Sequence, residues 1–233
     1  MQAIVLAGGL GTRLRPLTFA IPKPLMPVGE RPILEILIEN LASHGARDIY
    51  LAVGYRAELV ELYFQDGARF GVDIRYSRED KRLGTAGPVR LARDRFRISG
   101  TVLVINADII TKVDFKDLVG WHEKKKAAIT VGVRELERTV PFGVVEMEGD
   151  RITSIVERPA HSCLINCGIY ALDSEVVDLV PPDEEFYMPD LIQAVMDRGG
   201  AVCGYEVKEK WVSIDNIGDL EEETGRMERD APR

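Results

Sequence analysis

The sequence predicts an α/β fold, with a doubly wound, mostly parallel sheet and a smaller antiparallel part. Apolar runs alternate with amphipathic segments of helical length through the first half of the chain, which is typical of strand–helix–strand units. The second half contains two apolar runs around a Gly149-Asp150 turn, which indicates a β-hairpin. No internal repeat or low-complexity linker divides the 233 residues, so we expect a single domain.

The first half of the chain opens with a short apolar strand at Ala3–Ala7. After a glycine-rich turn, Pro32 begins an amphipathic helix, because proline fits the first helical turn and apolar residues follow at helical spacing. Gly45 ends that helix. Further strands are expected at Asp48–Val53, Val72–Tyr76, Thr101–Ile105 and Ala128–Val133, and further helices at Ala57–Phe64, Ala86–Arg93 and Phe115–Lys124.

The second half is expected to be more antiparallel. Its hairpin strands are Gly143–Glu148 and Arg151–Val156. Later strands are expected at Cys167–Leu172, Ala201–Val207 and Trp211–Ile214, and helices at Ser174–Val180, Leu191–Arg198 and from Ile217 onward. The charged tail Glu221–Arg229 favours a solvated helix face.

Composition limits the kinds of function. The net charge of −8 argues against a nucleic-acid partner bound through a broad basic surface. No apolar run is long enough for a membrane span, and the chain enters a strand at once, which leaves no room for a signal peptide. Cys163, Cys167 and Cys203 lack metal-ligand spacing and are too few for a disulfide framework. We therefore expect a cytoplasmic protein with reduced cysteines.

The glycine-rich turn after the first strand, within LAGGLGTRLRPLTFAIPKPLMPV, indicates phosphate binding. Gly8, Gly9 and Gly11 lack the Cβ atoms that would keep a phosphate away from backbone N–H groups. Arg13 and Lys23 add positive charge. The pattern is neither a P-loop nor a dinucleotide fingerprint, and a lone glycine pair would favour a plain tight turn.

Two aspartates are candidates for a Mg²⁺ site. Asp108 follows an apolar strand directly, so its carboxylate is expected at the ligand-binding edge of the sheet. Asp215, in WVSIDNIGDL, could supply a second carboxylate, with phosphate oxygens and water completing the coordination. The alternative for Asp108 is a helix cap or turn residue, and Asp215 with Asn216 is also an ordinary capping pair.

Two weaker signals complete the candidate site. The small residues of LGTAGP allow close approach of a base or ribose, although a helix-initiating turn explains them almost as well. Polar residues that flank apolar stretches in the second half could hydrogen-bond sugar hydroxyls and pair with a phosphate. These residues are Gly143, Glu157, Arg158 and Asn166.

Over nearly its full length the chain resembles the sugar-1-phosphate nucleotidylyltransferases. LAGGLGTRLRPLT with IPKPLMPV is similar to their nucleotide-binding signature, LGTAGP to the base-contacting loop, and NAD at Asn106–Asp108 to the segment with the first metal aspartate. FGVV and INCGIYAL resemble sugar-side segments. The resemblance implies a Rossmann-like sheet, with a nucleotide-binding half at 1–135 and, at 136–233, a sugar-phosphate-binding half with a C-terminal helix.

Two positions depart from the family pattern. The usual Glu-Lys-Pro is Glu157-Arg158-Pro159, so Arg158 would hold the sugar phosphate. The usual Trp-x-Asp-Ile-Gly motif is WVSID, so the second metal ligand is either displaced to Asp215 or partly lost at Ser213. The pattern of some cytidylyltransferase members favours Asp215.

The resemblance implies transfer of a nucleotidyl group from an NTP to a sugar 1-phosphate with Mg²⁺, and assigns roles by position. GTP and a mannose- or heptose-type sugar are favoured over thymidylyl, uridylyl or cytidylyl transfer. A silent nucleotide-sugar-binding regulatory subunit is the other alternative, and homo-oligomerisation stays open. Implied catalytic residues are Arg13, Lys23 and Asp108; nucleotide-binding residues are Leu6, Ala7, Gly8, Gly9, Gly11, Thr12, Gly84, Thr85 and Gly87; sugar-side residues are Gly143, Glu157, Arg158 and Asn166; metal ligands are Asp108 and Asp215.

Overall fold

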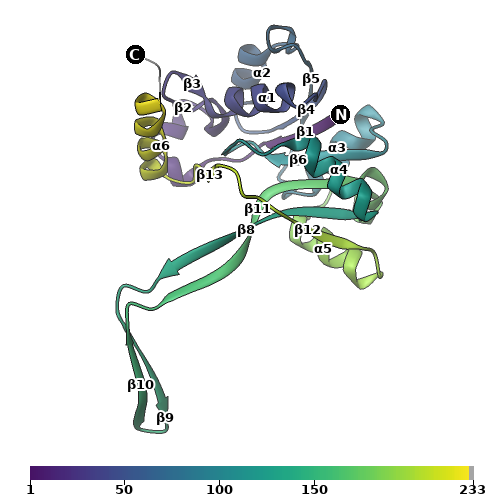
Figure 1. Ribbon diagram of the computed structural model, residues 1–233. Coiled ribbons are helices and arrows are strands. Elements are labelled where there is room, and N and C mark those ends of the chain that lie inside the picture. The colour runs from purple at the N-terminus through teal and green to yellow at the C-terminus, as the bar shows by residue number, and fades with distance from the viewer. Residues whose placement is uncertain (231–233) are drawn as a thin grey trace.

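The computed structural model describes residues 1–230 and shows a central sheet with helices on both faces (Figure 1). The strand order is β12-β8-β11-β6-β1-β4-β5, and within the described part only β11 runs antiparallel to its neighbours. The expected doubly wound, mostly parallel α/β fold is confirmed. The sheet strands are β1 (Gln2–Ala7), β4 (Asp48–Val53), β5 (Asp73–Arg78), β6 (Thr101–Asn106), β8 (Ile129–Thr139), β11 (Ala160–Asp173) and β12 (Val202–Glu206).

Two hydrophobic cores lie on opposite faces of this sheet. Successive side chains of β1 alternate between them, with Val5 in the first core and Ile4 in the second. α1 (Ile33–Ser43), α2 (Ala57–Phe64) and α4 (Phe115–Lys125) contribute to the first core. α3 (Gly87–Phe96) and α5 (Met188–Asp197) contribute to the second. Because both faces are covered, the central strands are apolar throughout.

A third, smaller core ties the end of the described chain to its beginning. It joins Leu14, Met26 and Ile33 to Ile110 and Ile214. Around it lie β2 (Pro27–Val28), β3 (Arg31–Pro32), β7 (Ile109–Thr111), β13 (Trp211–Ser213) and α6 (Ile217–Asp230). Short 3₁₀ helices occupy Thr12–Leu14, Leu17–Phe19, Lys23–Leu25, Ala68–Phe70 and Ser174–Leu179.

A long two-stranded ribbon leaves the sheet, and Figure 1 shows it projecting away from the rest of the molecule. β8 and β11 stay paired beyond the sheet, and β9 (Gly143–Glu148) and β10 (Arg151–Glu157) extend the ribbon as a hairpin. We call residues 134–166 the arm. Every residue of the arm is half-buried or exposed. The expected hairpin is present, but β8 and β11 are longer than the predicted strands because their pairing continues outside the core.

The charged tail Glu221–Arg229 is not solvent-exposed throughout, although the sequence predicted that it would be. Glu223 in α6 is buried, and its carboxylate forms an ion pair with Lys210 Nζ. The prediction of a solvated face is therefore wrong at Glu223, because a cation from the preceding segment neutralises the carboxylate. No helix within residues 1–230 has both the length and the apolar character needed to cross a lipid bilayer.

Candidate active site

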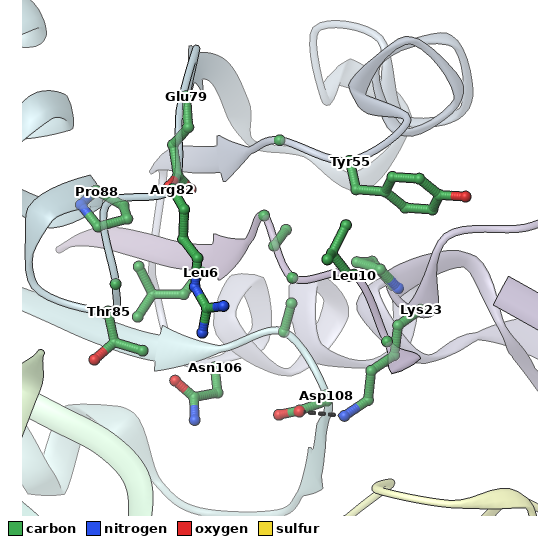
Figure 2. A pocket seen from close by; sticks show the side chains of 18 of the residues that line it. Leu6, Leu10, Lys23, Tyr55, Glu79, Arg82, Thr85, Pro88, Asn106 and Asp108 are labelled. Atoms are coloured by element: carbon green, nitrogen blue, oxygen red, sulfur yellow. Dashed lines mark hydrogen bonds and ion pairs between the residues drawn. The ribbon is translucent and has the colours of Figure 1, made fainter. Parts of the chain in front are cut away.

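A cavity of about 570 Å³ opens where the carboxyl ends of four neighbouring parallel strands meet. Loops after β1, β4, β5 and β6 line it, and Tyr187 adds a wall from the second half of the chain. Predicted site residues that line this cavity are Leu6, Ala7, Gly8, Gly9, Gly11, Thr12, Lys23, Gly84, Thr85 and Asp108. The strand order thus brings the glycine-rich turn, the LGTAGP loop and Asp108 together around one cavity (Figure 2).

Two hydrogen bonds from side chains help to hold the glycine-rich loop in place. Thr18 Oγ1 donates to the Gly11 carbonyl oxygen at 3.0 Å. Tyr55 Oη donates to the Thr18 carbonyl oxygen at 3.1 Å. These bonds fix the loop's backbone before any ligand arrives, which lowers the ordering cost of phosphate binding.

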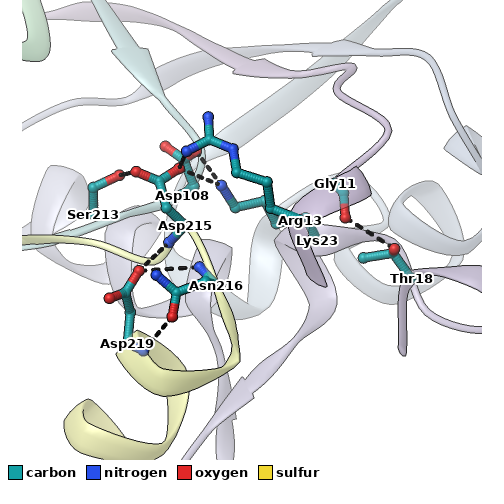
Figure 3. Close-up of polar contacts among 9 residues, drawn as sticks. All are labelled: Gly11, Arg13, Thr18, Lys23, Asp108, Ser213, Asp215, Asn216 and Asp219. Carbon is teal, nitrogen blue, oxygen red and sulfur yellow. Dashed lines mark hydrogen bonds and ion pairs between the residues drawn. The ribbon is translucent and has the colours of Figure 1, made fainter. Parts of the chain in front are cut away.

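Lys23 lies between the two candidate metal aspartates. Its Nζ is 2.5 Å from Asp108 Oδ2 and 3.5 Å from Asp215 Oδ1 (Figure 3). The Lys23 side chain is only 15% exposed, so these contacts are partly shielded from water. Arg13 Nη1 approaches Asp215 Oδ1 from the exposed side at 3.3 Å. Two cations and two carboxylates therefore meet in one cluster, of which Lys23 and Asp108 line the cavity and Arg13 and Asp215 do not.

Strand pairing brings Asp108 and Asp215 together across 107 positions of sequence. β7 pairs with β13 so that Ser213 lies opposite Ile109, and Ile214 N donates to the Asp108 carbonyl oxygen at 2.9 Å. Ser213 Oγ donates to Asp215 Oδ2 at 3.2 Å. Ser213 thus orients the carboxylate at position 215 instead of facing Lys23 itself.

The sequence also allowed Asp215 and Asn216 to be an ordinary helix-capping pair. In the structure the side chain of Asn216 caps the helix, and that of Asp215 does not. Asn216 Oδ1 accepts from Asp219 N at 3.1 Å, and Asp219 Oδ2 accepts from the backbone N–H groups of Asn216 and Asp215 at 3.0 and 2.7 Å. This reciprocal arrangement is a capping box at the start of α6. It leaves the Asp215 side chain free to face the cations (Figure 3).

The carboxylate pair fits a hard divalent cation. Asp108 Oδ1 is buried and has no hydrogen-bond partner among the described residues. Such an oxygen is a ready ligand for a cation that prefers carboxylates. Residues 1–230 contain no cluster of three or more His, Cys, Asp or Glu side chains able to hold a metal ion. A metal ion would therefore depend on two carboxylates together with substrate oxygens and water, which is usual for Mg²⁺.

The LGTAGP loop is pinned against the segment before α5. Gly84 forms a parallel bridge with Phe186 and has φ +78°, and an added Cβ would lie 2.4 Å from the Phe186 carbonyl oxygen. Thr85 Oγ1 accepts from Met188 N at 2.8 Å. Gly87 is buried at the first position of α3 instead of lining the cavity. The loop thus forms a fixed wall.

Glu79 is a cavity residue that the sequence reasoning missed. An added Cβ on Gly8 would lie 2.3 Å from Glu79 Oε1, so this carboxylate packs against the glycine-rich loop. Burial raises the Glu79 pKa to about 7, and the Leu83 backbone offsets part of that shift. Glu79 directly follows β5, and its position at a strand's carboxyl end was the signal that could have found it. Tyr55, Arg82 and Tyr187 were missed as well.

The predicted sugar-side residues are divided. Asn166 ends the arm near the cavity: the Gly168 N–H donates to its Oδ1, and a Cβ on Gly168 would lie 2.5 Å from Asn106 Nδ2. Gly143, Glu157 and Arg158 lie on the arm and do not line the cavity.

The nucleotidyl transferase family model matches residues 2–229. The chain belongs to this family. A mannose-1-phosphate guanyltransferase of Yarrowia lipolytica is 40% identical over 77% of this chain and 51% of that protein. A UTP–glucose-1-phosphate uridylyltransferase of Synechocystis is 35% identical over 94% of this chain and 61% of that protein. This nucleotidyl transferase therefore spans between about half and three fifths of the length of these relatives.

Solved structures agree with the family assignment. A glucose-1-phosphate thymidylyltransferase from Bacillus anthracis in complex with sucrose has a TM-score of 0.79 and 27% identity, covering 100% of this chain and 97% of that one. HddC from Yersinia pseudotuberculosis, complexed with GMP-PN, has a TM-score of 0.76 at 23% identity, covering 97% and 99%, and supports the fold alone. Members of the nucleotidyl transferase family generally use a divalent metal ion.

Proposed function

We propose that this chain transfers a nucleotidyl group from an NTP to a sugar 1-phosphate, giving an NDP-sugar and pyrophosphate. The observation that carries the proposal is the Asp108–Lys23–Asp215 cluster at the end of a glycine-lined cavity. The cavity and the adjoining Arg13 and Asp215 together offer backbone amides, cations and carboxylates, which a triphosphate and its metal ion require. GTP and a mannose-type sugar are favoured by the similar mannose-1-phosphate guanyltransferases, and a heptose-type sugar follows only from the resemblance of the sequence.

The proposed reaction needs no protein nucleophile. A phosphate oxygen of the sugar 1-phosphate attacks the α-phosphorus of the NTP in line and forms a new P–O bond. The bond from the α-phosphorus to the bridging oxygen breaks, and that oxygen leaves with pyrophosphate. Positioning and charge stabilisation supply the catalysis. Arg13 and the loop N–H groups neutralise the departing pyrophosphate, and Lys23 aligns the α-phosphate.

Asp108 and Asp215 would hold Mg²⁺. When bound, the ion supplies positive charge against the phosphate oxygens. The unpartnered Asp108 Oδ1 and the Ser213 hydrogen bond to Asp215 support this assignment. The lining of the cavity supports a nucleotide-binding half at 1–135, since all its residues except Tyr187 lie there.

Glu79 supports the preference for GTP. It lines the same cavity as the predicted base loop at Gly84 and Thr85, away from the Lys23–Asp108 end (Figure 2). A carboxylate can accept from the N1–H and the exocyclic amino group of guanine together. Uracil and thymine offer one N–H on that edge, so they leave part of the carboxylate unpaired.

A cytoplasmic location is proposed on separate grounds. Cys163, Cys167 and Cys203 are all unpaired thiols. Free cysteines are typical of a reducing compartment, which is also where nucleoside triphosphates are available.

A pyrophosphate-release assay tests the proposal. Wild-type protein with Mg²⁺ is offered each common NTP against mannose, heptose and glucose 1-phosphates. We expect clear release with one pair, with GTP preferred. Arg13→Ala should cut turnover severely without changing the melting temperature. Release with no pair would contradict the proposal and favour a silent regulatory subunit; near-normal turnover in Arg13→Ala would remove Arg13 from its role.

A further inference from the structure

The helix that follows Asp215 is attached to the rest of the molecule through few buried side chains. This helix, α6, lies at the edge of the molecule beside β2 (Figure 1). Leu220 and Met227 are partly buried against the third core. In the part of α6 whose burial the structure describes, Glu223 is the one buried residue. The orientation of α6 therefore depends on what holds the Glu223 carboxylate.

Lys210 holds the Glu223 carboxylate. Its Nζ forms an ion pair with Glu223 Oε1, and Arg226 Nη1 lies 3.7 Å from Glu223 Oε2. The Glu223 side chain is 1% exposed and that of Lys210 is 29% exposed. The backbone of Lys210 is fixed as well, because its carbonyl oxygen accepts from Lys112 N and from Thr111 Oγ1, both at 2.9 Å. The ion pair therefore ties α6 to the end of β7 and the start of β13.

The two elements joined by this ion pair present Asp215 between them. Lys210 directly precedes β13 and Glu223 lies within α6, so Asp215 occupies the turn that connects strand to helix. On the strand side, β13 pairs with β7, which directly follows Asp108. On the helix side, Asp219 Oδ2 accepts from Asp215 N at 2.7 Å. A change in the angle between β13 and α6 would therefore move the Asp215 carboxylate relative to Asp108.

Stability alone does not account for a charged pair at this position. The cost of removing two charges from water is about as large as their attraction, so apolar replacements of similar size are often equally stable. Glu223 lies three positions after Leu220 and four before Met227, on the face of α6 where a leucine would extend the apolar contact. Glu223 Oε2 has no hydrogen-bond partner among the described residues. A hydrogen-bonded ion pair is directional, however, and can define an angle that apolar contacts leave loose.

We propose that Lys210 and Glu223 are positioning residues, whose ion pair sets the angle between β13 and α6 and thereby the place of the Asp215 carboxylate beside Asp108. For the metal ion that these carboxylates would share, this rests on the proposed function. Within residues 1–230, neither Lys210 nor Glu223 lines the cavity or forms an ion pair with either aspartate. The pair therefore acts through the turn at 214–216.

An apolar replacement separates position from stability. Glu223→Leu fills the apolar face of α6, and the partly exposed Lys210 can turn to water, so the melting temperature should equal or exceed that of wild type. The double variant Lys210→Met/Glu223→Leu removes the cation too and leaves no unpaired charge. Asp178→Leu is the matched control, because it removes a carboxylate that pairs with Arg93 on α3.

Hydrogen–deuterium exchange of the protein without ligands tests the turn. The backbone N–H groups of Asp215 and Asn216 donate to Asp219, so they exchange when this turn opens. We expect these amides to exchange about tenfold faster in Glu223→Leu and in the double variant, which corresponds to losing one hydrogen bond to a charged group. Asp178→Leu should match wild type. Wild-type exchange in both apolar variants would overturn the proposal.

The second readout is the Mg²⁺ concentration that gives half of the GTP-dependent rise in melting temperature. Misplacing one of two carboxylate ligands weakens a metal site, so this concentration should rise about 10- to 100-fold in both apolar variants and stay unchanged in Asp178→Leu. An unchanged concentration in both apolar variants would overturn the proposal even if their amides exchange faster, because the ion pair would then be only structural.

The two readouts separate this proposal from the proposed function. If wild type releases no pyrophosphate with any substrate pair, the proposed function fails, while hydrogen exchange without ligands still tests whether the ion pair holds the turn. If wild type is active and both apolar variants match it in exchange and in Mg²⁺ requirement, the function stands and the positioning role is rejected.

Discussion

Under the proposed function, the carboxylate of Glu79 favours GTP over the other nucleotides. It packs against Gly8 of the glycine-rich loop and lines the same cavity as Gly84 and Thr85. In Glu79→Gln the amide keeps one acceptor but presents an N–H₂ group to the guanine donors. We expect kcat/KM for GTP to fall about 10- to 100-fold, which corresponds to losing a hydrogen bond to a charged group. The ratio of GTP to UTP efficiencies measures the effect.

Glu58→Gln, in the first turn of α2, is the matched control for that change and should leave both efficiencies unchanged. An unaltered GTP-to-UTP ratio in Glu79→Gln would show that the base is read elsewhere.

The same residue makes stability depend on pH. Its folded pKa of about 7 lies above the ordinary value of 4.5, so the folded state holds the proton more tightly than the unfolded state does. Ionised Glu79 therefore destabilises the fold above pH 7, and this penalty vanishes as pH falls below 4.5. Glu79→Gln should be more stable than wild type at pH 8 by roughly 1–2 kcal/mol, after discounting for partial exposure, and equal to it at pH 4. Urea unfolding at both pH values measures this, and an equal gain at both would contradict it.

The sequence alone located those candidate site residues that directly follow a predicted parallel strand. Asp108 and the glycine-rich loop could be predicted because each follows a parallel strand directly. Glu79 satisfies the same rule and was overlooked. Glu223 could not be placed from its charged neighbours, since its burial depends on Lys210 in another segment.

At the scale of elements, the start of α6 positions Asp215, one of the two carboxylates of the proposed metal site. Asp219 accepts from the backbone N–H of Asp215, so its removal frees the loop that presents this carboxylate. Asp219→Ala should cost about 0.5–2 kcal/mol of stability and raise the Mg²⁺ concentration needed for half-maximal turnover. Asp114→Ala removes a similar cap, from α4, at a distance from the cavity.

The two capping variants should therefore lose comparable stability in urea unfolding, while only Asp219→Ala changes the metal requirement. An identical metal requirement in both would mean that the capping box does not position Asp215.

The arm is the part of the fold whose strands were predicted but whose position relative to the sheet was not. The alternating apolar pattern predicts the hairpin at Gly143–Glu148 and Arg151–Val156. It does not reveal that β8 and β11 leave the sheet as a pair, because alternation looks the same on a covered and on an uncovered ribbon. The positions of Glu157 and Arg158 relative to the cavity depend on that departure, so their role stays a prediction.

At the scale of the whole molecule, ligand binding should raise thermal stability. GTP with Mg²⁺ at about 100 times its Kd stabilises the folded state by about 2.7 kcal/mol, which is about 5–10 °C in a domain of this size. We expect a much smaller shift with GTP or Mg²⁺ alone. In Asp108→Asn, GTP should give the same small shift with or without Mg²⁺. Differential scanning fluorimetry measures these shifts, and equal shifts with and without Mg²⁺ in wild type would contradict the two-carboxylate site.

Because Lys23 already contacts Asp108, a metal ion can bind this carboxylate only by displacing the ammonium group of Lys23. A divalent cation that takes Asp108 must release the ammonium group now 2.5 Å from its Oδ2, and the released ammonium needs a new anion. The triphosphate brings that anion, so metal and nucleotide each raise the affinity for the other by the same factor. If the metal ion binds without the triphosphate, the displaced ammonium group of Lys23 lacks an anion. If the triphosphate binds without the metal ion, part of its negative charge is not neutralised. Under the proposed function, the chain would therefore bind the metal–nucleotide complex in preference to either component alone.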